Sequence, residues 1–346
     1  MIAQTGTAAL LALMFSTLVG VRAMPIGRKL GLLDIPDGRR KFHHAVTPLV
    51  GGAAIVPCAL AAVALLWLAP GATTTNAMLH LSWFVVGVGS MFLLGVADDL
   101  YGLGPRFRLL FGAMVFVVVA SQAPHFRVST LDFGGAAPIA LGSAATLFTV
   151  ICLVGLLNAV NMADGKNGLV ISLSLIWTLA LWAHAPVSLA PVLAGLAVSL
   201  LVMLGFNMAG RLFLGDGGSY GLSAIMGLLA VYIYNANPMG LRAEMVALLF
   251  AVPVFDTLRL VVTRVRKGIS PFAPDRDHLH HHFAAFWGWP RGLIVYLALV
   301  GLPNMVAALV PALGVWMLAL TFVAYVLLLR WSMRASISPD AMPLRG

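Results

Sequence analysis

The chain has 346 residues, of which 61% are apolar and only 10% are charged, and its mean hydropathy is +0.98. Soluble domains carry about 25% charged residues, so this composition excludes an ordinary soluble enzyme. The two cysteines, Cys58 and Cys152, both lie inside apolar runs and provide neither a disulfide framework nor a metal-cysteine site. Long uninterrupted apolar runs predict a polytopic all-α membrane protein.

Eleven apolar runs are close to the roughly 20 residues that a helix needs to cross a bilayer. In chain order they lie at 2–21, 49–69, 79–97, 108–123, 143–160, 168–184, 188–207, 219–235, 243–262, 293–311 and 313–330. We expect them to form one integral membrane domain over 1–335, followed by a short tail at 336–346. A small surface hairpin is expected within 126–141, in the longest loop of the outer side.

The basic residues predict the orientation. The first of them, Arg22, follows the first apolar run, which argues for a retained helix with its N-terminus outside and against a cleaved signal peptide. Alternation from there leaves only Arg127 and Arg242 in outside loops, and the other 19 of 21 on the inner side, as the positive-inside rule requires. The C-terminus is then cytoplasmic. The positive charge faces membrane lipids and anionic substrates, and nucleic acid is not an expected partner.

Five polar clusters all fall on the inner side of this threading. The first contains Lys41 and His43 and is followed by Gly51-Gly52. The basic residues are typical of a positive-inside anchor, whereas the histidines and the glycine pair favour a backbone that approaches phosphate. Because all five clusters share one face, we expect a single active site at the cytoplasmic surface.

The second cluster contains the adjacent carboxylates Asp98 and Asp99, at the end of an apolar run and just before Arg106. Carboxylates are costly to place at the end of a membrane helix, and two like charges this close disfavour each other's ionised form. This pattern favours a Mg²⁺-binding or proton-transfer role over a solvated helix end.

The third and fourth clusters combine amides, carboxylates and glycines. Asn158 and Asn161 are three residues apart and share a helix face, with Asp164 just beyond them. Such a turn is typical either of a hard-cation and nucleotide site or of simple helix capping. The fourth cluster has Asp216 in a glycine-rich loop before a helix. We expect its amides to cradle a pyrophosphate while Asp216 holds Mg²⁺.

The fifth cluster contains four histidines, His278 and His280 to His282, between Arg276 and an apolar helix. Histidines beside aspartates are compatible with zinc, but the spacing of known zinc enzymes is absent. We prefer a role as donors to phosphate or sugar oxygens. Upstream, Asp256 and Arg259 are three apart and predict a helix-end ion pair.

Together these clusters resemble the polyprenyl-phosphate N-acetylhexosamine-1-phosphate transferase family (glycosyltransferase family 4). The resemblance rests on five ordered motifs, which are Asp34-x-Pro36 with Arg40-Lys41-x-His43 and Pro48-Leu-Val-Gly-Gly52, Ala97-Asp-Asp99, Asn158-x-x-Asn161-x-x-Asp164-Gly, Phe213-x-Gly-Asp216-x-Gly-Ser219 and Pro274-Asp-Arg-x-His278-Leu-His-His281. Within the family the motifs are similar to the branch that transfers GlcNAc-1-phosphate to undecaprenyl phosphate. One departure is Asn167, which stands where many bacterial members have a second aspartate.

The resemblance implies a reaction and a role for each matched residue. A UDP-N-acetylhexosamine donates its sugar-1-phosphate to undecaprenyl phosphate in the bacterial inner membrane, with release of UMP and with Mg²⁺, or Mn²⁺ in its place, as cofactor. This starts a lipid-linked glycan of the cell envelope, such as the O-antigen of lipopolysaccharide. The implied assignments are Asp98 and Asp99 for catalysis, Asp216 and Asn161 for the metal, Asp164, Asn167, Phe213 and Asn158 for the nucleotide, and Lys41, His43, Arg106, Arg276, His278, His280 and His281 for phosphates or sugar.

Two other functions are kept open. The dipeptide His282-Phe283 is similar to the peptidoglycan branch of the family, which transfers phospho-N-acetylmuramoyl-pentapeptide. A proton- or ion-coupled transporter would instead need ionisable groups near the middle of the spans, where this chain has almost none. The pattern is also compatible with a homodimer.

Overall fold

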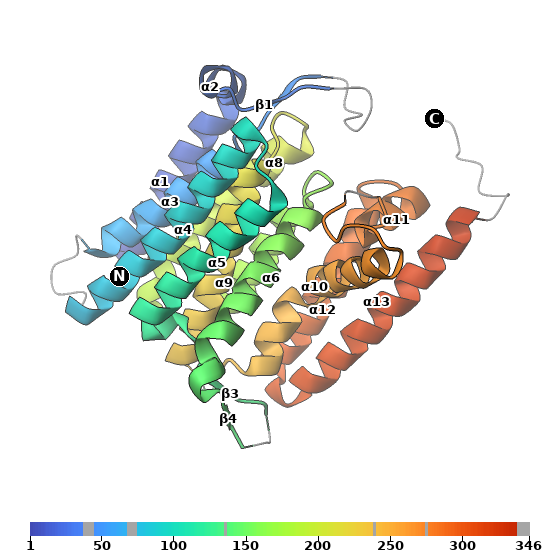
Figure 1. Ribbon diagram of the computed structural model, residues 1–346. Coiled ribbons are helices and arrows are strands. Elements are labelled where there is room, and N and C mark those ends of the chain that lie inside the picture. The colour runs from blue at the N-terminus through green and yellow to red at the C-terminus, as the bar shows by residue number, and fades with distance from the viewer. Residues whose placement is uncertain (37–44, 68–74, 135–136, 238–239, 274–275, 338–346) are drawn as a thin grey trace. The chain divides into compact units, whose positions relative to one another are not determined.

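The computed structural model describes residues 1–36, 45–67, 75–134, 137–237, 240–273 and 276–337, and this part of the chain is almost entirely helical (Figure 1). Its α-helices are α1 (Ile2–Val21), α2 (Ala23–Leu30), α3 (Gly51–Trp67), α4 (Thr75–Tyr101), α5 (Pro105–Gln122), α6 (Ala145–Ala163), α7 (Leu169–Trp182), α8 (Ala190–Met208), α9 (Gly215–Ala236), α10 (Ala243–Arg266), α11 (Leu279–Trp287), α12 (Arg291–Leu309) and α13 (Gly314–Ile337). Short 3₁₀ turns lie at Pro124–Phe126, Gly142–Ala144, Val187–Leu189 and Pro311–Leu313.

Each of the eleven predicted spans coincides with one of these helices, which confirms an all-α polytopic membrane protein. Nine helices in the described residues are long and apolar enough to cross a membrane, while α3 and α7 are shorter apolar helices. Only the helix fold satisfies every backbone polar group inside one apolar segment, so long apolar runs translate directly into helices. The count of eleven spans and their orientation remain predictions.

Two pairs of very short strands connect the helices. Strand β1 (Leu33–Asp34) pairs antiparallel with β2 (Thr47–Pro48). Strand β3 (Thr130–Leu131) pairs antiparallel with β4 (Ile139–Ala140), which confirms the hairpin expected within 126–141.

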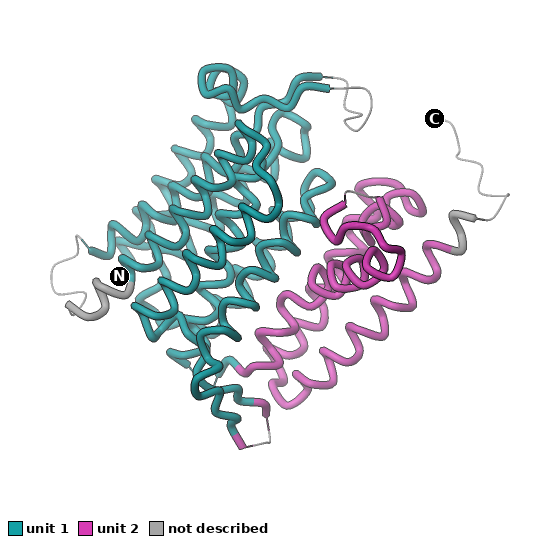
Figure 2. Tube along the Cα trace, in the orientation of Figure 1, with its two compact units in different colours: residues 1–132, 138–241 teal, residues 133–137, 242–346 magenta. Residues whose placement is uncertain are grey.

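The contacts within the chain group into two compact units (Figure 2). Unit 1 comprises residues 1–132 and 138–241, and unit 2 comprises residues 133–137 and 242–346. In unit 1, α9 packs against α3, α4, α6 and α7, and nearly all of its length is buried. In unit 2, α10, α12 and α13 pack against one another, and α11 packs on α12 and α13. The single domain expected over 1–335 stays a prediction.

The Gly51-Gly52 pair at the start of α3 packs against the start of α9. A Cβ atom at Gly51 would lie 2.9 Å from the Cα of Leu214, and one at Gly52 would overlap the backbone of Gly218. The backbone N–H groups of both glycines donate to the carbonyls of Phe213 and Leu214, at 3.0 Å each. Because these N–H groups are already bonded, the expectation that they approach a phosphate was wrong, and the glycines serve close helix packing.

Candidate active site

The C-terminal end of α4 meets the N-terminal end of α9 in unit 1, at a place that we call the α4–α9 junction. This junction brings together the predicted cluster of Asp98 and Asp99 and the predicted cluster of Asp216. The carboxylate of Asp99, near the end of α4, accepts hydrogen bonds from the backbone N–H groups of Asp216 and Gly217, each at 3.0 Å. Helix N-termini leave such groups without partners inside the helix, and an anion is stabilised there. Asp99 therefore caps α9 from a different helix. These two N–H groups are therefore bonded to Asp99 and not to a pyrophosphate, while a pyrophosphate contact by the other amides of this loop stays a prediction.

The two residues predicted to hold the metal lie side by side. The Nδ2 of Asn161, near the end of α6, donates to Oδ1 of Asp216 at 2.7 Å and to Oγ of Ser219 at 3.1 Å. Within the described residues, Oδ2 of Asp216 and Oδ1 of Asn161 accept no hydrogen bond. One carboxylate oxygen and one amide oxygen are thus available at the junction of α6 and α9.

Asp98 is buried and accepts three hydrogen bonds. Its Oδ1 accepts from the backbone N–H of Leu103 at 2.8 Å, and its Oδ2 accepts from Nη1 of Arg108 at 2.5 Å and from the hydroxyl of Tyr220 at 3.0 Å. These donors fix the position of the carboxylate. Arg106, which is predicted to bind phosphate or sugar, has an exposed side chain. No role was predicted from the sequence for Arg108 or Tyr220. Both arginines lie in the first turn of α5, and only the direction of each side chain distinguishes them.

Negative charge accumulates around Asp216. Asp164 ends α6, and its partial burial together with the carboxylates of Asp216 and Asp99 raises the pKa of Asp164 to about 8. In the part of the chain that is described, no three His, Cys, Asp or Glu side chains lie close enough to hold a metal by themselves. Mg²⁺ is commonly held by one or two carboxylates plus substrate phosphates, and the donor set of Asp216 and Asn161 fits that pattern.

A buried amide ties the third and fourth clusters together. Asn207, at the end of α8, accepts from the backbone N–H of Gly168 at 2.6 Å and donates to the carbonyl of Leu212 at 3.0 Å. No role was predicted for Asn207 from the sequence. Its two bonds connect the turn that carries Asn167 to the segment that carries Phe213.

The residues predicted for the nucleotide are all in unit 1. Asn167 and Phe213 are half-buried, and the backbone of Phe213 pairs with Pro48 and Gly51. The Nδ2 of Asn158 donates to the carbonyl of Val154 in its own helix at 2.7 Å. Nucleotide binding by these residues remains a prediction.

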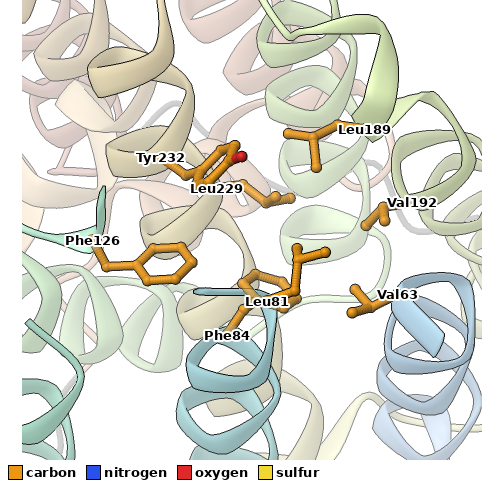
Figure 3. A pocket seen from close by; sticks show the side chains of 8 residues that line it. All are labelled: Val63, Leu81, Phe84, Phe126, Leu189, Val192, Leu229 and Tyr232. Carbon is orange, nitrogen blue, oxygen red and sulfur yellow. The ribbon is translucent and has the colours of Figure 1, made fainter. Parts of the chain in front are cut away.

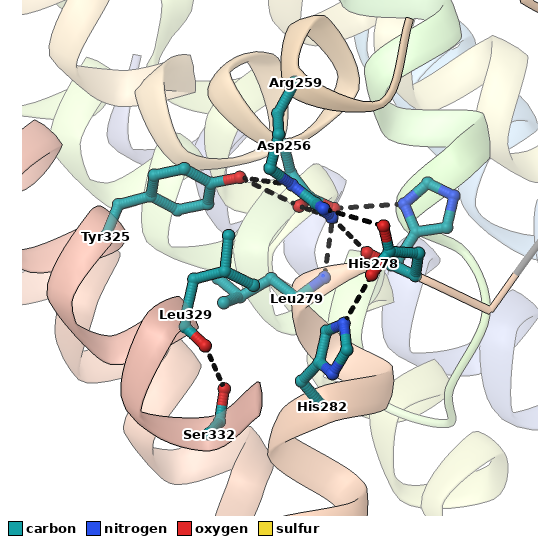
Figure 4. Close-up of polar contacts among 9 residues, drawn as sticks. Asp256, Arg259, His278, Leu279, His282, Tyr325, Leu329 and Ser332 are labelled. Carbon is teal, nitrogen blue, oxygen red and sulfur yellow. Dashed lines mark hydrogen bonds and ion pairs between the residues drawn. The ribbon is translucent and has the colours of Figure 1, made fainter. Parts of the chain in front are cut away.

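Unit 2 contains an aspartate–histidine cluster of Asp256, Arg259, Asp277, His278 and His282. The predicted ion pair between Asp256 and Arg259 is confirmed, with a distance of 3.0 Å between Oδ1 and Nη2. Asp256 also binds the Nδ1 atom of His278 at 3.0 Å (Figure 4). The rings of His280 and His281 lie 4.3 Å apart between centroids, with His280 buried and His281 half-buried. Arg276 is exposed, while Lys41 and His43 lie outside the described residues.

A small apolar cavity in unit 1 is separate from these groups (Figure 3). None of the predicted site residues contributes to its lining, as far as the chain is described. It is lined by Val63, Leu81, Phe84, Phe126, Leu189, Val192, Leu229 and Tyr232.

The chain is similar in sequence to known transferases. Residues 80–234 match the family model described as glycosyl transferase family 4. Relatives from Yersinia pestis and Escherichia coli strain K12 are each named undecaprenyl-phosphate alpha-N-acetylglucosaminyl 1-phosphate transferase, and each is 28% identical over 87% of this chain and 81% of its own length. Residues 80–234 of the chain are thus similar to glycosyl transferase family 4. A Bacillus subtilis strain 168 relative, named a probable undecaprenyl-phosphate N-acetylglucosaminyl 1-phosphate transferase, is 28% identical over 90% of this chain and 86% of its own length.

These similarities, together with the long apolar helices, support a multi-pass membrane transferase. Residues 80–234, which match the family model, include the α4–α9 junction with Asp98, Asp99, Asn161 and Asp216. The aspartate–histidine cluster lies beyond residue 234, within the longer region that is aligned with the curated relatives. The carboxylates of the α4–α9 junction are therefore the first candidates for the chemistry of this family.

Proposed function

We propose that this protein transfers GlcNAc-1-phosphate from UDP-GlcNAc to undecaprenyl phosphate, releasing UMP and starting a lipid-linked glycan of the cell envelope. The supporting observation is the junction of Asp99, Asp216 and Asn161, which lies in the segment matched by the family. The names of the relatives specify the sugar and the lipid acceptor. The proposal places the protein in the bacterial inner membrane with its site on the cytoplasmic face, where the basic loops are expected.

The proposed reaction depends on Mg²⁺, or on Mn²⁺ in its place, held by the carboxylate of Asp216 and the amide oxygen of Asn161. When bound, the ion would supply positive charge against the oxygens of the donor pyrophosphate, whose negative charge grows as the bond to UMP breaks. Asp99 keeps Asp216 in place by binding the start of α9.

We further propose that Asp98 accepts the proton of the lipid phosphate when that phosphate is still a monoanion. Its three donors hold the carboxylate in one position, so the residue is well oriented. A phosphate monoester has a second pKa of about 6, so most of the acceptor is already dianionic at neutral pH and only the remaining monoanion needs a base.

The deciding experiment uses the purified full-length protein with undecaprenyl phosphate, Mg²⁺ and a panel of UDP-sugars. We expect UDP-GlcNAc to yield UMP and a lipid-linked GlcNAc-1-phosphate. Release of UDP would indicate ordinary glycosyl transfer and would contradict the mechanism. Turnover of UDP-N-acetylmuramoyl-pentapeptide alone would assign the protein to the peptidoglycan branch, and omission of divalent cations should abolish every reaction.

A further inference from the structure

The buried carboxylate of Asp256 gathers donors from three parts of unit 2. Its Oδ2 binds Nδ1 of His278 at 3.0 Å and the backbone N–H of Leu279, at the start of α11, at 3.1 Å. Its Oδ1 accepts from Nη2 of Arg259 and from the hydroxyl of Tyr325 on α13, each at 3.0 Å. Asp256 is only 4% exposed. All four lone-pair positions of a carboxylate are therefore used, and its orientation is fixed.

These contacts determine which nitrogen of His278 carries a proton. The guanidinium of Arg259 and the N–H of Leu279 can only donate to Asp256, and a carboxylate paired with an arginine can only accept hydrogen bonds. Nδ1 of His278 must therefore be the donor. The same oxygen binds the N–H of the next residue, Leu279, and thereby fixes both the ring and the backbone. Within the described residues, Nε2 of His278 makes no hydrogen bond.

Arg259 connects this arrangement to a second carboxylate. Its guanidinium donates to Oδ2 of Asp277 at 3.0 Å and to the carbonyl of the same residue, while Nε donates to the Tyr325 hydroxyl at 3.1 Å. Oδ1 of Asp277 binds Nε2 of His282 at 2.8 Å. The two carboxylates thus bind the same guanidinium, and each also binds one imidazole. Figure 4 shows Asp256 with Arg259 and His278.

We propose that Asp256 is a positioning residue that holds His278 through Nδ1–H, so that Nε2 is the atom that meets a phosphate oxygen of the substrate. Because Asp256 occupies Nδ1, Nε2 is the ring nitrogen left for the substrate, and a proton on Nε2 would let it donate to a phosphate oxygen. The identity of the substrate rests on the proposed function, whereas the orientation of His278 rests on the contacts of Asp256 alone.

The orientation is tested without any substrate, by ¹⁵N NMR of histidine-labelled full-length protein in lipid bilayers at alkaline pH. The variant His278→Gln identifies the signals by their loss. We expect neutral wild-type His278 to carry its proton on Nδ1. A wild-type protein with the proton of His278 on Nε2 would overturn the proposal, even if no variant of Asp256 folds.

Asp256→Asn should reverse this arrangement. The amide oxygen will face Arg259, so the amide NH₂ group will face His278 and require Nδ1 to accept. We expect the proton of His278 to move to Nε2. Asp277→Asn is the matched control, because it removes a neighbouring carboxylate from the same arginine but should leave the tautomer of His278 unchanged. An unchanged tautomer in Asp256→Asn would refute the proposal.

Kinetics separate positioning from mere stabilisation of the fold. With UDP-GlcNAc and undecaprenyl phosphate we expect Asp256→Asn to lower kcat per folded molecule by about 10- to 100-fold, as for other partners that orient a functional histidine. Tyr325→Phe, which keeps the carboxylate, should change kcat by less than about threefold. Less folded protein at an unchanged kcat would show a purely structural role and contradict the proposal. A wild-type protein that forms no UMP would refute the proposed function while leaving the tautomer result intact.

Discussion

The substitution Asp99→Asn tests whether Asp99 acts by holding the start of α9. In the wild-type protein its two carboxylate oxygens accept the N–H groups of Asp216 and Gly217, each at 3.0 Å. Asparagine can accept only one of these bonds through its carbonyl oxygen, and its NH₂ group would face the other donor. One backbone N–H of α9 would then be left without a partner.

The magnitude follows from these two bonds. A hydrogen bond to a charged group contributes about 1.5–3 kcal/mol. Since one such bond is lost, we expect the free energy of unfolding to fall by about 1.5–3 kcal/mol. Reversible unfolding in mixed detergent micelles measures this change. Asp132→Asn is the matched control, because it is an aspartate of unit 1 whose backbone N–H, rather than its carboxylate, donates to Tyr234; it should change stability by less than about 0.5 kcal/mol.

The activity of Asp99→Asn should fall together with its stability, because Asp216 follows the start of α9. Raising the pH should not restore this activity, since no proton transfer has been removed. A variant with wild-type stability and no activity would refute the helix-anchoring role and assign Asp99 to the chemistry itself.

Three further substitutions test Asp216 and Asp98 of the α4–α9 junction and the neighbouring Asp164 at the end of α6. Asp216→Asn should abolish turnover even at saturating Mg²⁺ and leave the protein folded in detergent, because asparagine can still accept from Asn161; near-wild-type turnover would remove Asp216 from the metal site. Asp98→Asn should lower turnover most below about pH 6, where the lipid phosphate is largely a monoanion, and should approach wild-type turnover at higher pH, as a kcat profile will show. In the folded protein the pKa of Asp164 is raised to about 8. The native state therefore binds one more proton than the unfolded state between about pH 4 and 8. Without metal, the free energy of unfolding should fall as the pH rises through that range. Asp164→Asn should remove this fall in thermal unfolding curves, and an unchanged slope would contradict the raised pKa.

Some site contacts were predictable because they are local. Asp256 and Arg259 are three residues apart on a helix, and their ion pair follows from that spacing. Asn161 and Asp216 were assigned to one metal through the family resemblance, and the structure brings them to 2.7 Å. The additional partners of Asp256 are more distant in the chain, 22 residues away for His278 and 69 for Tyr325, and these contacts leave no sign in the local sequence.

The glycine-rich segments show how a motif can be recognised and its role misread. Gly51-Gly52 and the glycines around Asp216 are compatible with a phosphate-binding backbone. The same residues are also what two helices need when their backbones approach closely. Only the packing of α3 on α9 decides between these uses, because it shows that the N–H groups are bonded to carbonyls and to Asp99.

The sequence by itself determined the helical membrane fold, since an apolar run of about 20 residues can satisfy its backbone only by forming a helix. It also determined which residue types cluster at the ends of the spans. The tertiary structure decided the partner of each carboxylate: Asp99 binds the start of α9, 117 residues away in the chain, and Asp98 binds Arg108 in preference to Arg106. Hydropathy reports whether a residue is buried, whereas a hydrogen bond depends on the direction of individual atoms, which only the packed helices specify.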